Sequence, residues 1–141
     1  MAAATWEHFE HRADIGVRGI GCDMAEAFEQ AALAMTAIIT EPASVRPEKT
    51  VRLACREADP ELLFVDWLNQ VIFAMATRGM LFSQFDVHIA GNGELQAEIR
   101  GEAVDRARHA PAVEIKGATF TELSVRLRAD GLWVAQCVVD V

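Results

Sequence analysis

Hydrophobic residues recur along this chain with two different spacings, one typical of helices and the other typical of strands. Residues 24–39 carry apolar side chains at helical spacing, and Asp23 precedes them as an N-cap with Glu26 in the capping-box position. A second helix is predicted to begin at Pro60, because proline fits the first helical position, and to end at Gly79. Both main helices are therefore expected before residue 80.

Strand-like alternation fills most of the remaining sequence. Residues 7–20 read as extended chain with a break near Asp14, and the Gly-Asn-Gly sequence at residues 91–93 has the composition of a hairpin turn. The other predicted strands cover residues 51–55, 85–89, 95–99, 113–116 and 123–127, and a last one begins at Leu132. Two early helices and a later run of strands predict a single α+β domain over residues 1–141, with the helices packed on a largely antiparallel sheet.

The charge balance narrows the range of partners. The 141 residues include 13 basic and 21 acidic side chains, which gives a formal net charge of -8. A surface of this sign repels the phosphate backbone of nucleic acids, so direct nucleic-acid binding is not expected. A metal ion or a basic protein partner fits the charge better.

Cysteine usage and hydropathy indicate a cytoplasmic protein. Cys22, Cys55 and Cys137 are odd in number and widely spaced, so they predict neither a disulfide framework nor a zinc site. The N-terminal residues lack a basic segment followed by an apolar one, and no window reaches the roughly 18 apolar residues of a membrane-spanning helix. Secretion and membrane insertion are therefore not expected.

The candidate chemistry lies in two acidic segments at opposite ends of the chain. Asp14 lies in the break of the first extended segment, and Asp140 is the penultimate residue, next to the α-carboxylate of Val141. If the fold brings these groups together, they supply the hard oxygen ligands that calcium and magnesium prefer. Each aspartate also has an ordinary interpretation: Asp14 as a turn or cap residue, and Asp140 as part of a solvated chain end.

The sequence lacks the motifs of several enzyme classes. It has no nucleophile elbow, no phosphate-binding glycine loop and no His-Glu-x-x-His helix. The Gly-Ile-Gly sequence at residues 19–21 lacks the third glycine and the βαβ context of a dinucleotide site. An independent nucleotide-hydrolysing or zinc-dependent enzyme is therefore not indicated.

Several short motifs occur in order through almost the whole chain. They are His11 to Arg18, Glu26-Ala27-Phe28, Asp66-Trp67-Leu68-Asn69, Phe82 to Phe85, Gly101-Glu102, Arg108-His109, Glu114-Ile115-Lys116, Ala118-Thr119 and Asp140-Val141. Together they resemble the archease family, whose members are accessory proteins of the RtcB-type RNA ligase that joins tRNA halves. No single motif is specific alone, so the resemblance depends on the whole series.

The resemblance implies an archease-like α+β fold and a divalent cation held by Asp14, Asp140 and Val141, with calcium expected and magnesium as the alternative. It also implies that the protein is not an enzyme. It would act as a non-catalytic activator that docks on an RtcB-type RNA ligase, promotes guanylylation of the ligase histidine and supports turnover in tRNA splicing or RNA repair. Its contact with RNA would be only indirect.

The chain departs from the family pattern at two places. Arg12 stands where the family usually has threonine in its first motif, although the aspartate of that motif is retained as Asp14. Gly117 stands where an alanine usually follows the Glu-Ile-Lys triplet. The arginine changes the expected hydrogen bonding around its loop and the fit to a partner, while the metal ligand itself is unaffected.

Four further residues are candidates for contact with the ligase: His11, Arg108, His109 and Lys116. A solvated strand edge is the alternative for Arg108, His109 and Lys116, and packing within its loop is the alternative for His11. Asp66 is interpreted as a half-buried, architectural carboxylate, held by hydrogen bonds to neighbouring strands, because a buried charge needs partners.

Two other functions stay open at this point. A small metal-dependent phosphohydrolase would hold magnesium with Asp14 and Asp140 and use His11 or His109 as acid or base, and turnover by the isolated protein would reveal it. A generic scaffold or chaperone-like module would have a purely structural acidic end, and metal-independent binding of diverse partners would reveal that one.

Overall fold

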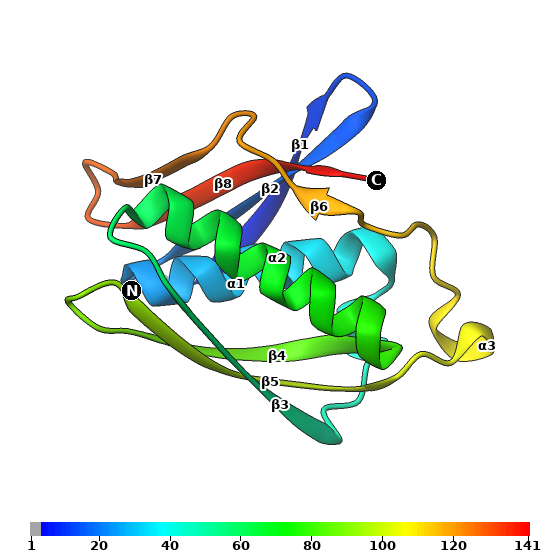
Figure 1. Ribbon diagram of the computed structural model, residues 1–141. Helices are drawn as coiled ribbons and strands as arrows, with labels where there is room; N and C mark the ends of the chain where they lie inside the picture. The colour runs from blue at the N-terminus through cyan, green and yellow to red at the C-terminus, as the bar shows by residue number, and fades with distance from the viewer. Residues whose placement is uncertain (1–3) are drawn as a thin grey trace.

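Two antiparallel sheets enclose the helices in the computed structural model, which describes residues 4–141 (Figure 1). Sheet A contains β1 (Thr5–His11), β2 (Asp14–Gly21), β6 (Gly117–Ala118), β7 (Ser124–Leu127) and β8 (Trp133–Asp140). Its central strand is β8, which pairs with β2 along one edge and with β6 and then β7 along the other. Sheet B contains β3 (Lys49–Arg56), β5 (Glu94–Ala103) and β4 (Met80–Ile89), with β5 in the middle.

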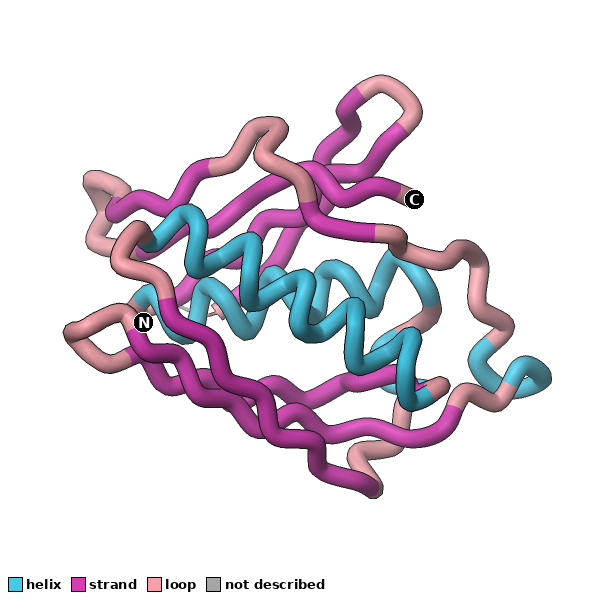
Figure 2. Tube along the Cα trace, in the orientation of Figure 1, coloured by secondary structure: helices cyan, strands magenta, loops and turns pink. Residues whose placement is uncertain are grey.

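The two long helices form the layer between the sheets. They are α1 (Met24–Ile39) and α2 (Pro60–Arg78). Figures 1 and 2 show both helices with sheet A on one side and sheet B on the other. A 3-10 turn, η1 (Pro42–Ser44), and a short helix, α3 (Arg106–His109), lie in the connections. The predicted α+β class is confirmed, while the strands divide into two sheets rather than one.

Local hydrogen bonds explain why the helices begin and end where the sequence predicts. The Asp23 carboxylate accepts from the Glu26 backbone amide, and the Glu26 carboxylate accepts from the Cys22 amide, so two of the free donors at the start of α1 are satisfied. Asp59 caps α2 by accepting a hydrogen bond from the Glu61 amide. Gly79 ends α2 in the left-handed conformation with φ +62°, which glycine adopts without steric cost.

One predicted strand is absent. Residues 113–116 form no strand pair, and regular pairing with β8 begins only at Gly117, opposite Asp140. Because the two strands are antiparallel and β8 ends at Asp140, residues before Gly117 run past the end of their partner. Their alternation of apolar and polar residues therefore has no strand to pair with.

A single apolar core lies between the layers. Trp67 of α2 is fully buried, and its indole N–H donates to the carbonyl of Phe28 in α1 at 2.9 Å. Phe28 also packs against Phe64, with ring centroids 5.0 Å apart, so aromatic contacts join the two helices. Gly19 of β2 lies directly against the α1 backbone at Ala27, where no larger residue would fit. Within residues 4–141, no helix is both long and apolar enough to cross a membrane.

Candidate functional site

The β1–β2 turn and the C-terminal end of β8 meet at one end of sheet A. His11 pairs with Asp14 across the β1–β2 turn, and Ile15 pairs with Val139 between β2 and β8. Asp14 and Asp140 are the next residues outward on these two strands. Figure 1 accordingly shows the C-terminus at the same end of sheet A as the β1–β2 turn. The fold thus brings together two residues that are separated by almost the full length of the sequence.

The side chains of these residues lie on the face of sheet A that points away from the helices. Val139 packs in the core and Gly19 faces α1, so the residues at alternate positions to them point to the opposite face. Asp140 and Asp14 belong to that opposite set, and His11 joins them through its pairing with Asp14. We call His11, Asp14 and Asp140 the acidic row.

The carboxylates of the acidic row differ in exposure. Asp140 is exposed and Asp14 is half-buried. Within residues 4–141, neither side chain takes part in a hydrogen bond or an ion pair. Two like charges at adjacent positions of neighbouring strands repel each other, and a cation between them would remove that repulsion.

The donor set suits a hard cation but does not by itself surround one. Among the described residues 4–141, no group of three or more histidine, cysteine, aspartate or glutamate side chains is placed to hold a metal ion. Asp14 and Asp140 supply two carboxylates, so further oxygen donors would have to come from main-chain or α-carboxylate groups, water or a second molecule.

Packing on both sides of Asp140 fixes the end of β8. The side chain of Val141 packs against the core, on the face opposite to Asp140. The carbonyl oxygen of Asp140 accepts a hydrogen bond from the Lys116 amide at 2.7 Å, and Gly117 pairs with Asp140 as the first residue of β6. These contacts hold the chain end in place and bring the exposed Lys116 next to the acidic row.

Arg12 lies at the turn of the β1–β2 hairpin. Its backbone has φ +56°, a left-handed conformation that is unusual for an arginine. The side chain is exposed and makes no hydrogen bond with any residue from 4 to 141. Arg12 therefore places an exposed cation at the edge of the acidic row.

The Arg108-His109 pair has a structural partner that the sequence analysis did not assign. Arg108 forms a bidentate ion pair with Glu102, with both N···O distances at 2.7 Å. His109 Nδ1 accepts a hydrogen bond from the Asp105 amide, so the proton of the neutral ring is on Nε2. Nε2 lies 2.9 Å from the Glu102 carboxylate and donates to it. The hydrogen bonds from Arg108 are the main reason that the pKa of Glu102 lies well below its usual range.

This network determines which of the two residues can reach a partner. The ring of His109 is 0% exposed, so it cannot touch a docking protein in this conformation, whereas Arg108 is 30% exposed. Arg108 also donates to the carbonyl of Ser44 at 2.6 Å, and the Arg46 amide donates to Glu102 at 2.8 Å. The network therefore fastens α3 to the loop after α1. No periodicity in β5 singles out Glu102 as buried, since its side-chain partners, Arg108 and His109, follow only after the strand ends.

Asp66 does not have the environment predicted for it. The residue is half-buried on α2, but its carboxylate takes no hydrogen bond from any strand within residues 4–141, so the predicted architectural role is wrong. Instead it lines a surface cavity of about 330 Å³ beside Phe120. The neighbouring Asn69 makes the strand contact, because its side-chain oxygen accepts from the Ala118 amide at 2.9 Å.

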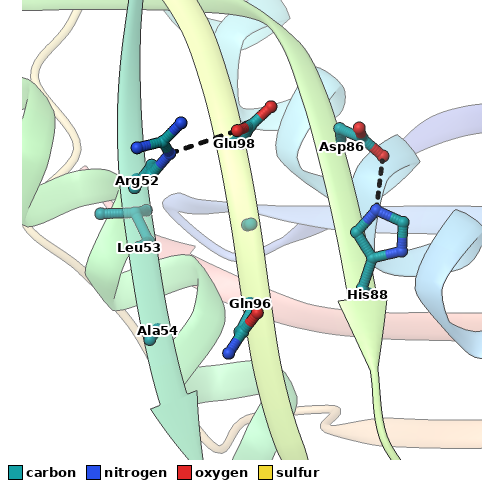
Figure 3. A pocket seen from close by; sticks show the side chains of 8 residues that line it. Arg52, Leu53, Ala54, Asp86, His88, Gln96 and Glu98 are labelled. Carbon is teal, nitrogen blue, oxygen red and sulfur yellow. Dashed lines mark hydrogen bonds and ion pairs between the residues drawn. The ribbon is translucent and has the colours of Figure 1, made fainter.

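A hollow on the outer face of sheet B differs from the acidic row, because its polar side chains lie in pairs. Figure 3 shows Arg52 pointing toward Glu98 across β3 and β5, and Asp86 toward His88 on β4. These pairs have N···O distances of 3.2 Å and 3.4 Å. Glu98 matches the charge of Arg52 and the His88 ring lies beside the Asp86 carboxylate, as on an ordinary solvated sheet surface. It offers no group of uncompensated charge comparable to the acidic row.

Comparison with known proteins agrees with the fold and the motifs. Residues 6–141 match the archease protein family. The chain is 35% identical over 139 residues to the protein archease of Thermococcus gammatolerans, and the alignment covers 96% of this chain and 98% of the relative. It is also 35% identical over 139 residues to the protein archease of Methanopyrus kandleri, with 96% and 99% covered.

Two solved structures share the architecture. The solution structure of Methanobacterium thermoautotrophicum protein 1598 has a TM-score of 0.84 and 32% identity, with 96% of this chain and 98% of that chain covered. A crystal structure from Thermotoga maritima, described as an archease and possible chaperone, has a TM-score of 0.56 and 20% identity over 96% of each chain, which shows the fold alone. The chain belongs to the archease family, as its ordered motifs predicted.

Proposed function

We propose that this archease is a non-catalytic activator of an RtcB-type RNA ligase in the cytoplasm, and that it acts through a divalent cation bound at the acidic row. Calcium is the expected cation and magnesium the alternative, with Asp14, Asp140 and the carboxylate of Val141 as donors. Docking would promote guanylylation of the ligase and its turnover in tRNA splicing or RNA repair.

The observation that supports the proposal most is the convergence of Asp14 and Asp140 at one exposed end of sheet A, where neither forms an ion pair within residues 4–141. An enzyme site is normally a concave pocket that removes its substrate from water. Here the carboxylates lie at the rim of a sheet, where a second protein can approach them. This placement favours delivery of a cation to a partner over chemistry within the chain.

The charge of the molecule supports the choice of partner. The net charge of -8 makes the chain attractive to the basic surface with which a ligase binds RNA. Lys116 and the partly exposed Arg108 lie on the segments that lead to the acidic row and could contact acidic groups beside that basic surface. His11 completes the row on the β1 side.

The proposal is tested by measuring ligase guanylylation and RNA joining under multiple-turnover conditions with substoichiometric archease. Wild-type protein should stimulate both steps, and Asp14→Asn and Asp140→Asn should each abolish the stimulation. A variant that extends the chain beyond Val141 by one glycine tests the α-carboxylate and should reduce stimulation less than either aspartate variant does. Circular dichroism verifies that each variant is folded.

Glu10→Gln is the matched control, since it removes one exposed carboxylate from β1 on the other face of the strand. It should leave stimulation unchanged. Absence of stimulation by folded wild-type protein with a cognate ligase would contradict the proposal. Phosphate release by the isolated protein that depends on Asp14 and Asp140 would instead establish the phosphohydrolase alternative.

A further inference from the structure

Exposed apolar side chains gather around one helix of this protein. Six large hydrophobic residues in the described chain are exposed, and all except Leu127 lie on α2 or beside it. Leu62 and Phe73 belong to α2, and Phe120 lies next to its N-terminal half. Val104 and Val113 line a groove beside its C-terminal half. A concentration of this kind on one face of a charged protein is typical of an interaction surface.

A small acidic cavity lies within this apolar surface. It has a volume of about 330 Å³ and lies between the N-terminal half of α2 and the segment that follows β6, which Figure 1 shows alongside the helix. Its lining includes Glu57, Asp66, Asn69 and Phe120 but no basic residue. We call it the α2 notch. A volume near the lower end of small-molecule pockets suits a single long side chain.

The charge in the α2 notch is uncompensated. Neither the Glu57 nor the Asp66 side chain forms an ion pair or a hydrogen bond within residues 4–141. Asp66 is only half-exposed, so water compensates its charge less fully than at an open surface. The electrostatic effect is visible inside the protein, where burial and then the charges of Asp66 and Glu57 raise the pKa of Cys55 to about 11.

We infer that the α2 notch binds an arginine side chain from an apolar segment of a partner protein. The guanidinium would form charge-assisted hydrogen bonds with Asp66 and stack on the ring of Phe120, which is 67% exposed at the notch. Arginine fits better than lysine, because only its planar group can pair with a carboxylate and stack on an aromatic ring at once. Apolar residues next to the arginine would cover Leu62 and Phe73.

This surface is distinct from the acidic row but connected to it by β6. Gly117 of β6 pairs with Asp140, and the next residue, Ala118, donates its amide to Asn69 in the notch. A partner seated on α2 would therefore hold the two-residue strand that abuts the acidic row. The inference goes beyond the proposed function, because it does not depend on which protein docks or on whether a metal binds.

The inference is tested by NMR, with the ¹⁵N-labelled full chain titrated with the dipeptide N-acetyl-leucyl-arginine amide. The amide shifts should concentrate at Asn69, Ala118 and Phe120. The same dipeptide with citrulline, which is uncharged and nearly isosteric, should bind about tenfold more weakly. Asp66→Asn should weaken binding of the arginine dipeptide by about tenfold and Phe120→Ala by about threefold.

Controls make each outcome decisive. Asp66→Asn removes no hydrogen bond, so the fold should be retained, and Glu41→Gln removes one exposed carboxylate elsewhere and should leave binding unchanged. Equal binding of the citrulline dipeptide, an unchanged affinity in Asp66→Asn, or equivalent shifts with calcium alone would each overturn the inference. Shifts confined to the acidic row would do the same. Loss of ligase stimulation would not, since that result bears only on the proposed function.

Discussion

The network around Glu102 and the acidic row show two opposite ways of placing carboxylates. Glu102 is buried, and its oxygens accept from Arg108, His109 and the Arg46 amide. Asp14 and Asp140 lie side by side at the end of sheet A with no such donors within residues 4–141. The first arrangement is closed to further ligands, while the second still has its full capacity to accept a cation.

Solvent explains why both arrangements can exist in one molecule. A buried carboxylate loses its hydration and must recover that free energy through hydrogen bonds and an opposite charge. Asp140 is exposed, so water screens its repulsion with Asp14 and the row costs little without a partner. Acidic residues from the same series of motifs thus differ in what they can bind: buried Glu102 is held by the protein's own donors, while exposed Asp140 stays accessible to a ligand.

Removal of the buried charge should produce the largest effect on stability. Glu102→Gln keeps the shape of the side chain but removes the closer of the two ion pairs of Arg108, so that only the Asp105 carboxylate at 3.8 Å remains. Loss of one member of a buried pair is strongly destabilising, so we expect Tm at neutral pH to fall by roughly 10 °C. The matched control Glu98→Gln, in an exposed pair on sheet B, should shift Tm by less than about 2 °C. Equal shifts would contradict the distinction between the two environments.

The pH dependence of the same variant tests the cause. The pKa of Glu102 is lowered in the folded protein, chiefly by Arg108, so its contribution is fully present above the unfolded-state pKa of about 4.3. The contribution is lost as pH falls from that value toward the lower folded-state pKa. The Tm difference between wild type and Glu102→Gln should therefore be constant from pH 7 to 5 and shrink below about pH 4. A difference that grew on acidification would show that the charge is not responsible.

A smaller effect of opposite sign is expected at the acidic row. Without divalent cations, Asp14→Asn and Asp140→Asn should each stabilise the protein by about 0.5 kcal/mol, because they relieve repulsion between like charges on adjacent strands. With millimolar calcium, wild type should gain stability and both variants should not. Thermal unfolding with a chelator measures the effect of the repulsion on stability, and thermal unfolding with calcium measures the stabilisation by the cation. Identical responses of wild type and variants to calcium would exclude the row as the cation site.

The sequence predicted those parts of this structure that depend on neighbouring residues. Both long helices were predicted because their caps, at Asp23 and Gly79, are local signals. The division of the strands into two sheets could not be predicted, since the same alternation occurs in β5 of sheet B and in β8 of sheet A. Which sheet a strand joins depends on the helices packed against it.

The candidate site shows the same division. Asp14 and Asp140 were found because of their positions at a break and at a chain end, together with the series of motifs. The role of Glu102 could not be predicted, because its ion pair with Arg108 depends on how α3 folds back onto the end of β5. Asp66 is half-buried as predicted, but the strand hydrogen bonds assigned to it are absent within residues 4–141, because the fold places its side chain at a surface cavity.

The smallest expected effects concern backbone strain. The Glu102 network and the acidic row each have a neighbouring non-glycine residue with positive φ. Ala110 ends α3 beside His109 with φ +44°, and Arg12 turns the hairpin beside Asp14 with φ +56°. Ala110→Gly should raise stability by about 0.5 kcal/mol, because the relief of left-handed strain slightly exceeds the entropy cost of glycine. Arg12→Gly relieves the same strain but also removes a cation from the acidic row, so its gain should be smaller and should increase when calcium is added. Chemical denaturation of both variants with and without calcium measures this difference, and an equal response to calcium would show that Arg12 exerts no electrostatic influence on the row.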